Sequence, residues 1–280
     1  MQFGPNDPLS ASPAAVTFEV TTRCNLTCVM CAHGSPGGMP NKRDAPQPLI
    51  NFVLSQLDEL EEVHPTGVGE PMMAPGFWEI VDALSGRAAP LLTFNTNGIL
   101  LTAANVARLS KAPIGRVNVS IDAADDLTYT RIRGGELRKT INGLDRLVAA
   151  VAKMPQANRI RIAISMVLMR ENIEEASAFV RLAHAHGVKS VYFEHMAEAF
   201  DWKGEWIIKK DNFIFNYEEQ RLFRDPELSD RHILKALDVA DELGIVIESP
   251  ELLMMPENMH HLNRRCITGA IANVFGQVAQ

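Results

Sequence analysis

Three of the four cysteines in this 280-residue chain lie close together, with Cys24, Cys28 and Cys31 spaced as C-x3-C-x2-C. Three thiols cannot all be paired with one another in disulfides, but a loop allows three sulfurs to converge on one metal centre. A [4Fe–4S] cluster is usually held by four thiolates, so three cysteines leave one iron without a protein ligand. Because such an iron can bind a substrate or cofactor, the spacing predicts a catalytic cluster.

Zinc is the alternative for the same residues. Together with His33, the three cysteines would complete a Cys3His ligand set. Zinc sites usually separate their ligands into well-spaced pairs, however, and four ligands in so short a stretch are cramped. The sequence therefore favours the iron–sulfur cluster.

Further polar motifs follow the segments that we expect to be strands. Gly69-Glu70-Pro71 comes after the second strand, and the third strand ends in Asn95-Thr96-Asn97-Gly98. Ser120 and Asp122 end the fourth strand, and Arg133 follows in the stretch TYTRIRGG. Taken singly, each motif has an ordinary structural explanation, since Asn-Gly favours turns and aspartate caps helices.

Together, these motifs resemble those of the radical S-adenosylmethionine (SAM) enzymes, with Met30 in the usual apolar position before the last cysteine. The resemblance implies a ligand role for Cys24, Cys28 and Cys31 in a [4Fe–4S] cluster. It also implies that several groups contact SAM, namely Gly69, Glu70 and Pro71 at its amine, Asn95 and Asn97 along its pocket, and Ser120, Asp122 and Arg133 at its carboxylate end. Met30 would contact the adenine or belong to the core.

The resemblance also implies a reaction. In the family, the open iron chelates SAM, and one electron cleaves the S–C5′ bond to give methionine and a 5′-deoxyadenosyl radical. This radical abstracts a hydrogen atom from an organic substrate, while the protein positions the reactants and excludes water. We expect a flavodoxin- or ferredoxin-type electron donor. The subtype stays open among dehydrogenation, decarboxylation, epimerisation and related reactions.

Alternating strand and helix patterns predict the scaffold. Six strands are expected, at Val16–Thr21, near Glu61–Thr66, and at Leu91–Asn95, Arg116–Ile121, Arg159–Met169 and Val188–Phe193, with helices between them. This order predicts an α/β fold with a parallel sheet and right-handed crossovers. Six units are too few for a closed eight-stranded barrel, so we expect a partial (β/α)6 barrel with a short C-terminal extension. Its chemistry belongs at the C-terminal strand ends.

The residues after the sixth strand are harder to interpret. Glu194 and His195 follow it and are candidates for a proton acceptor, or else form a rim charge or supporting hydrogen bond. Residues 196–225 concentrate aromatic side chains without clear periodicity, so they either cover the barrel mouth or contact substrate, or else form a packed linker. Aromatic residues of this segment include Trp202, Trp206, Phe213, Phe215 and Tyr217. A helix at Asp230–Leu243 and a strand at Ile245–Ile247 follow.

We therefore expect a flexible lead-in over 1–15, a core over 16–195, a linker or capping segment over 196–265, and over 266–280 the start of an extension. The last segment, with Cys266, resembles the opening of a SPASM or twitch extension. One thiolate cannot hold a second cluster. We expect truncation within the extension, with an auxiliary cluster only if the chain continues beyond Gln280; the alternative is a lost centre and a free thiol.

Composition and charge limit the cellular compartment and the classes of binding partner that we expect. A formal charge of −7 argues against a nucleic-acid-binding surface, and the sequence has neither a secretory signal nor a membrane-length apolar run. We expect a cytoplasmic protein. The short segment before the cysteines leaves no room for a separate peptide-recognition domain, which favours a small-molecule substrate such as a sugar or nucleoside. The alternatives are a peptide- or protein-modifying maturase and, in another class, a non-catalytic Fe–S electron carrier or scaffold.

Overall fold

The computed structural model describes residues 14–39, 41–155, 160–197, 206–210, 213–248 and 252–254. The expected lead-in up to residue 13, Trp202 and the extension with Cys266 lie outside the described residues. No helix in these ranges is both long and apolar enough to cross a membrane.

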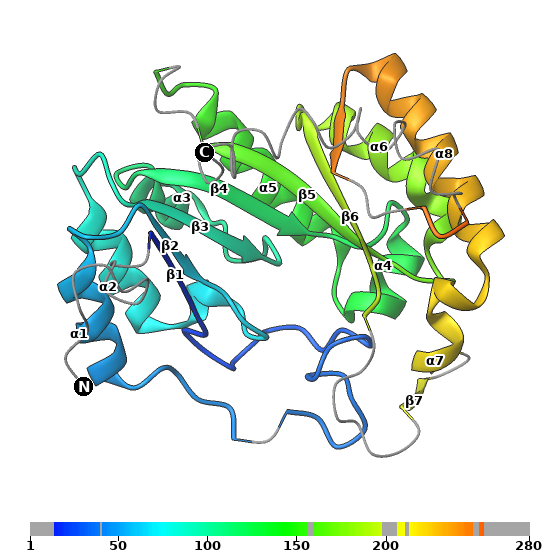
Figure 1. The fold of residues 1–280 in the computed structure, drawn as a ribbon, viewed down its shortest axis with the longest axis horizontal. Coiled ribbons are helices and arrows are strands. Elements are labelled where there is room, and N and C mark those ends of the chain that lie inside the picture. The colour runs from blue at the N-terminus through cyan, green and yellow to red at the C-terminus, as the bar shows by residue number, and fades with distance from the viewer. Residues whose placement is uncertain are drawn as a thin grey trace, which may run out of the picture. The chain divides into compact units, whose positions relative to one another are not determined.

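The fold is built on a parallel sheet of seven strands in the order β1-β2-β3-β4-β5-β6-β9 (Figure 1). The strands are β1 Ala15–Phe18, β2 Glu62–Pro65, β3 Leu91–Thr96, β4 Ile114–Ser120, β5 Arg161–Leu168, β6 Ser190–His195 and β9 Val246–Glu248. The predicted α/β partial barrel is confirmed. The sheet has one strand more than the six expected, because the strand predicted near residue 246 pairs in parallel with β6.

Helices and short 3-10 turns connect the strands. They are α1 Gln47–Gln56, η2 Pro71–Met73, α2 Pro75–Leu84, α3 Ala103–Leu109, α4 Asp126–Arg133, α5 Leu137–Val151, η4 Ile173–Glu175, α6 Ala176–Ala185, α7 Tyr217–Gln220, η5 Leu222–Arg224 and α8 Pro226–Leu243. The Thr102 side chain caps α3 by accepting from the N–H of Asn105. Helix α4 was not predicted; Asp125 caps its start, and Gly134 ends it in the left-handed conformation.

The chain forms two compact units. Unit 1 consists of Met1–Asn25, Met39–Asn118 and Gly143–Arg161, and unit 2 of Leu26–Gly38, Val119–Asn142 and Ile162–Gln280. Unit 1 contains β1 to β3, most of β4, and α1 to α3. Its core includes Phe77 and Phe94, whose rings meet edge to face with centroids 5.0 Å apart. Unit 2 runs past residue 195, where we expected the core to end.

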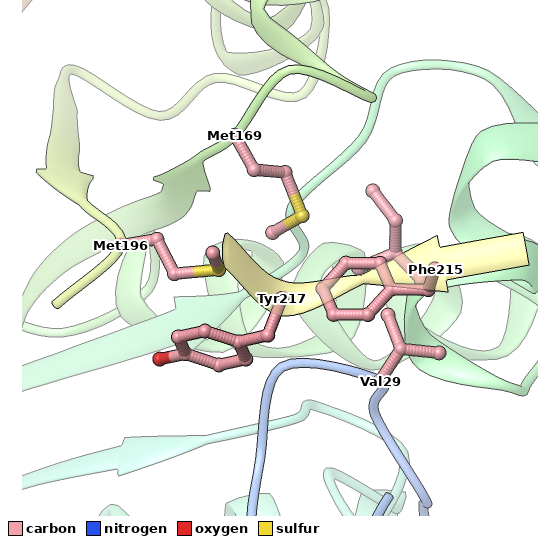
Figure 2. Packing of buried hydrophobic residues seen from close by; sticks show 6 residues of the cluster. Val29, Met169, Met196, Phe215 and Tyr217 are labelled. Carbon is pink, nitrogen blue, oxygen red and sulfur yellow. The ribbon is translucent and has the colours of Figure 1, made fainter. Parts of the chain in front are cut away.

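Unit 2 contains most of β5, with β6, β9, α4 and the helices from α6 to α8. Helix α8 packs along α6 (Figure 1). Within the segment predicted to lack periodicity, the chain forms an antiparallel hairpin of β7 Ile207–Lys210 and β8 Phe213–Asn216. Its apolar side chains join a buried group, here called the hairpin cluster (Figure 2), which comprises Val29, Ile132, Met169, Met196, Phe215 and Tyr217.

Candidate functional site

The three cysteines of the predicted cluster motif form no disulfide bonds and lie on a loop of tight turns. Cys24 and Cys31 are partly exposed, whereas Cys28 is buried. The N–H of Cys31 donates to the Cys28 carbonyl at 3.0 Å, and the N–H of Gly34 donates to the Cys31 carbonyl at 2.8 Å. A Cβ at Gly34 would lie 2.2 Å from the Cys28 carbonyl oxygen, so only glycine permits this close approach.

The donor chemistry of this loop fits an iron–sulfur cluster. Within the described parts of the chain, no three Cys, His, Asp or Glu side chains already stand together as a metal site. The motif supplies three thiols, the ligand type that holds Fe–S clusters. A side-chain N–H of Asn97 also lies 3.8 Å from the Cys24 sulfur, and hydrogen bonds to the sulfurs are one means by which proteins set a cluster's potential.

In unit 1, the Gly-Glu-Pro turn is tied to the turn that ends β3. The Glu70 carboxylate is only 2% exposed and accepts hydrogen bonds from the Thr96 hydroxyl at 2.8 Å and the Asn97 N–H at 2.7 Å. A Cβ at Gly69 would lie 2.1 Å from the Thr21 carbonyl oxygen. Two predicted SAM motifs are therefore joined through one buried carboxylate, while Pro71 opens η2 beside them.

Asn97 links this turn to the residues around the first cysteine. Its side-chain amide donates to the Asn25 side-chain oxygen at 2.7 Å, and its own oxygen accepts from the N–H of Ile99 at 3.1 Å. Asn95 lies two residues earlier in β3 and is exposed. The next residue, Gly98, has a φ of +78° and allows close packing, since a Cβ at Gly143 of α5 would lie 2.0 Å from its carbonyl oxygen.

A second set of hydrogen bonds in unit 1, made by Arg23 just before the first cysteine, was not predicted from the sequence. Arg23 makes a two-pronged contact with the Asp44 carboxylate at 2.9 and 2.8 Å and donates to the Met73 carbonyl at 2.7 Å. The Arg23 carbonyl accepts from the N–H of Glu70 at 2.8 Å. No periodic or motif signal links residues so far apart in the sequence, so only the fold reveals this contact.

In unit 2, Asp122 organises the end of β4. Its φ of +65° is unusual for a residue other than glycine. One carboxylate oxygen accepts from Arg133 at 2.5 Å and the other from the N–H of Val167 at 2.7 Å, while its carbonyl accepts from Asn172 at 2.8 Å. Ser120, two residues earlier, is partly exposed. Asp122 therefore holds the end of β4 to β5 and to α4.

The Arg133 guanidinium is a buried cation near the cysteine loop. Burial alone would lower its pKa, but the nearby Cys28 sulfur and Asp122 carboxylate raise the pKa above its ordinary value. The group therefore stays charged. Arg133 is held by Asp122, and the predicted contact with a SAM carboxylate stays a prediction.

The two proton-acceptor candidates do not face the same way. Both lie within β6, where consecutive side chains point to opposite faces. The His195 ring lies 5.3 Å from the Phe223 ring. Desolvation, and then the charge of Asp122, raises the pKa of the Glu194 carboxyl, although the side chain is exposed. Of the two candidates, Glu194 is thus the one close enough to the Asp122 carboxylate to interact with its charge.

Met30, the predicted adenine contact, is partly buried and packs against the hairpin cluster. The preceding residue, Val29, belongs to that cluster, and its carbonyl accepts a hydrogen bond from the indole N–H of Trp206 at 3.1 Å. The aromatic content of residues 196–225 indicated a cover or a packed linker. It did not indicate this contact with the cysteine loop.

Comparisons with known proteins agree with the motifs. The profile of the Radical SAM superfamily matches residues 18–183, more than half of the chain. Mycofactocin maturase MftC of Mycobacterium tuberculosis is 31% identical over 229 residues, which cover 72% of this chain and 56% of MftC. AdoMet-dependent heme synthase of Methanosarcina barkeri is 29% identical over 182 residues, covering 64% of this chain and 49% of the synthase. The chain thus spans about half the length of these curated relatives.

A solved structure shows the same fold. Streptococcus suis SuiB bound to S-adenosylmethionine aligns with a TM-score of 0.63 at 15% identity, covering 86% of this chain and 51% of SuiB. The superfamily match favours the iron–sulfur cluster over the zinc alternative for the cysteine motif. The chain belongs to the radical SAM superfamily, whose enzymes use a [4Fe–4S] cluster and SAM.

Proposed function

We propose that this chain is part of a radical SAM maturase that modifies a peptide substrate. The observation that carries the proposal is the C-x3-C-x2-C motif, whose cysteines form no disulfide, in a chain 31% identical to a protein named as a maturase, MftC. SuiB, which is similar in fold alone, has been solved bound to the precursor peptide SuiA. The heme synthase is named for a small molecule, but it is less similar, at 29% identity over 64% of this chain against 31% over 72% for MftC, so we prefer the maturase alternative.

In this proposal, Cys24, Cys28 and Cys31 hold the cluster. When bound, the cluster and SAM supply a 5′-deoxyadenosyl radical that abstracts a hydrogen atom from the substrate. Residues of the chain bind and orient SAM. We further propose that the chain belongs to a SPASM-type subgroup and receives its electron from a flavodoxin- or ferredoxin-type donor. Cys266, on which the SPASM resemblance depends, lies outside the described residues.

The SAM contacts are proposed for each unit separately. In unit 1, the backbone of Gly69 to Pro71 and the Asn97 turn offer polar groups to the SAM amine, with Asn95 beside them. The Glu70 carboxylate already accepts two short hydrogen bonds, and we assign it first to fixing this turn. In unit 2, the Ser120 hydroxyl is the proposed contact for the SAM carboxylate.

Two further unit 2 residues have proposed roles. Arg133, held by Asp122, supplies fixed positive charge for the anionic end of SAM and for the cysteine sulfurs. Glu194 is the proposed proton acceptor, because it is exposed and near Asp122.

Cleavage of SAM tests the enzyme assignment. Protein reconstituted anaerobically with iron and sulfide is mixed with SAM and dithionite, and 5′-deoxyadenosine and methionine are measured by chromatography. We expect both products from the wild type and neither from Cys28→Ala, whereas Cys266→Ala should retain cleavage. Absence of both products from cluster-loaded wild type would support the non-catalytic electron carrier or scaffold instead.

Transfer of deuterium tests the substrate class. An extract from cells grown in deuterated medium is separated by dialysis into a peptide fraction and a small-molecule fraction, and each is incubated with the reduced enzyme and unlabelled SAM. Deuterium should enter 5′-deoxyadenosine from the peptide fraction. Label arriving only from the small-molecule fraction would restore the sugar or nucleoside expectation.

A further inference from the structure

Val29, in the cysteine loop, is bonded through both of its backbone polar groups to other parts of unit 2. It lies between Cys28 and Met30, and its side chain is only 5% exposed. Its N–H donates to the Ile132 carbonyl at 2.8 Å, and its carbonyl accepts from the Trp206 indole at 3.1 Å. Both backbone groups are thus bonded to segments distant in the sequence, and these bonds fix the peptide planes on either side of the residue.

Trp206 is itself held in place by Tyr217, the residue that directly follows the hairpin. The Trp206 carbonyl accepts from the N–H of Tyr217 at 3.0 Å, and the two rings lie with centroids 4.6 Å apart. The Tyr217 hydroxyl in turn donates to the Ala197 carbonyl at 3.1 Å. Figure 2 shows Tyr217 and Phe215 of this region packed with Val29 and two methionines. These contacts therefore fix the indole ring whose N–H donates to the Val29 carbonyl.

We propose that Trp206 is a positioning residue that holds the Cys28–Cys31 turn in the conformation that binds iron, through its hydrogen bond to the Val29 carbonyl. The inference rests on the proposed ligand role of these cysteines. Next to a buried side chain, a carbonyl that loses its partner is costly to leave unsatisfied. Without the indole N–H, the turn opens more often, and Cys28 becomes accessible more often.

The hydrogen bond can be separated from packing. Trp206→Phe keeps an aromatic ring packed against the hairpin cluster and removes the N–H. Tyr217→Phe is the matched control, because it removes a side-chain hydrogen bond of the same length, 3.1 Å, from the same cluster. Its acceptor is Ala197, however, and not the cysteine loop. The Tyr217 hydroxyl also interacts with the charge of Cys31, so the modification rate at Cys28 is the one that should respond to the first variant alone.

The experiment measures thiol accessibility in the cluster-free full chain under anaerobic conditions, by the rate at which iodoacetamide modifies Cys28 and Cys31, read by mass spectrometry. We expect Trp206→Phe to raise the rate about tenfold, equivalent to ~1.4 kcal/mol in the opening equilibrium. Tyr217→Phe should leave the rate within about twofold of wild type, since its lost bond does not reach the loop.

Equal rates in wild type and Trp206→Phe would overturn the proposal, and so would equal acceleration in both variants, which would indicate general loosening of the hairpin. If Trp206→Phe does not fold, benzothienylalanine at position 206 keeps the shape of the indole and lacks only its N–H, and the same outcomes apply. Because the protein is cluster-free, the result is independent of whether it cleaves SAM or modifies a peptide.

Discussion

Glu70 should be the residue whose loss most weakens the turn around Asn97. Its carboxylate is 2% exposed and accepts two short hydrogen bonds, from the Thr96 hydroxyl and the Asn97 N–H. Hydrogen bonds to a charged group contribute about 1.5–3 kcal/mol each. Glu70→Ala removes both, together with the longer bond from the N–H of Met72 at 3.4 Å, and leaves three buried donors without an acceptor, so we expect a loss of about 3–6 kcal/mol in the free energy of unfolding.

Glu70→Gln tests how much of this loss depends on the charge. The amide keeps one acceptor oxygen but directs an NH2 group at one of the two donors, and both contacts lose their charge assistance. We expect a loss of about 1–3 kcal/mol, smaller than for Ala. The assay is urea unfolding of the cluster-free protein, followed by circular dichroism.

Glu79→Gln is the matched control, because Glu79 in α2 accepts one exposed hydrogen bond, from Gln47 at 2.8 Å. It should change the free energy of unfolding by no more than about 0.5 kcal/mol. If Glu70→Ala costs no more than this control, the carboxylate does not hold the turn, and its role reverts to the direct SAM contact predicted from the sequence. Calorimetric titration of SAM into the reconstituted variants measures that contact separately.

Three further predictions concern other residues. A Gly-to-Ala change ordinarily stabilises a helix by up to about 1 kcal/mol. In Gly143→Ala, however, the new Cβ would lie 2.0 Å from the Gly98 carbonyl oxygen, so urea unfolding should show a loss of about 1–3 kcal/mol in the free energy of unfolding. A gain would contradict this packing. Arg133→Gln leaves Asp122 buried without its cation and should cost about 3–5 kcal/mol, part of which Asp122→Asn in the same chain should restore; no recovery would refute the pairing. The pKa of Glu194 is raised above its ordinary value of 4.5, so ionisation of this group opposes folding as the pH rises from 4.5 through the higher folded value. Above this interval the free energy of unfolding of Glu194→Gln should exceed that of wild type, by under about 1 kcal/mol because the group is exposed, and below it the two should be equal. Urea midpoints whose difference from wild type does not change with pH would refute the shift.

The parts of the fold with a strong local signal were predictable. The buried strand β5 and the amphipathic helix α5 follow apolar periodicity, and β9 was predicted within a residue. What periodicity could not give was the partner of β9, because pairing with β6 depends on the path of the whole chain. The sequence therefore predicted the fold class but one strand too few in the sheet.

Helix α4 and the β7–β8 hairpin were not predicted from the sequence, for different reasons. The buried face of α4 includes Thr128 and Arg133 beside Tyr129 and Ile132, so a search for apolar side chains at helical spacing underestimates it. The β7–β8 region has two short apolar runs separated by polar residues in the sequence, which is a usable hairpin signal. The aromatic and charged composition of residues 196–225 obscured it.

At the site, the sequence identified the groups but not their contacts. The cysteine spacing and the order of motifs pointed to the superfamily that the comparisons confirm. The links that hold these motifs, from Glu70 to Thr96 and from Trp206 to Val29, join residues 26 and 177 positions apart. Contacts at such separations depend on packing, to which a linear pattern gives no access.

The interleaving of the two units has a consequence for synthesis on the ribosome. The first segment of unit 2, Leu26–Gly38, carries Cys28 and Cys31, and the next segment of that unit begins at Val119. Roughly 80 residues must be translated in between, which takes about 4–16 s at ~5–20 residues per second. Throughout this interval the loop lacks the α4 and hairpin residues that later pack against Val29 and Met30. The nascent chain therefore passes through a stage in which these cysteines are open to iron delivery, and equally to oxidation.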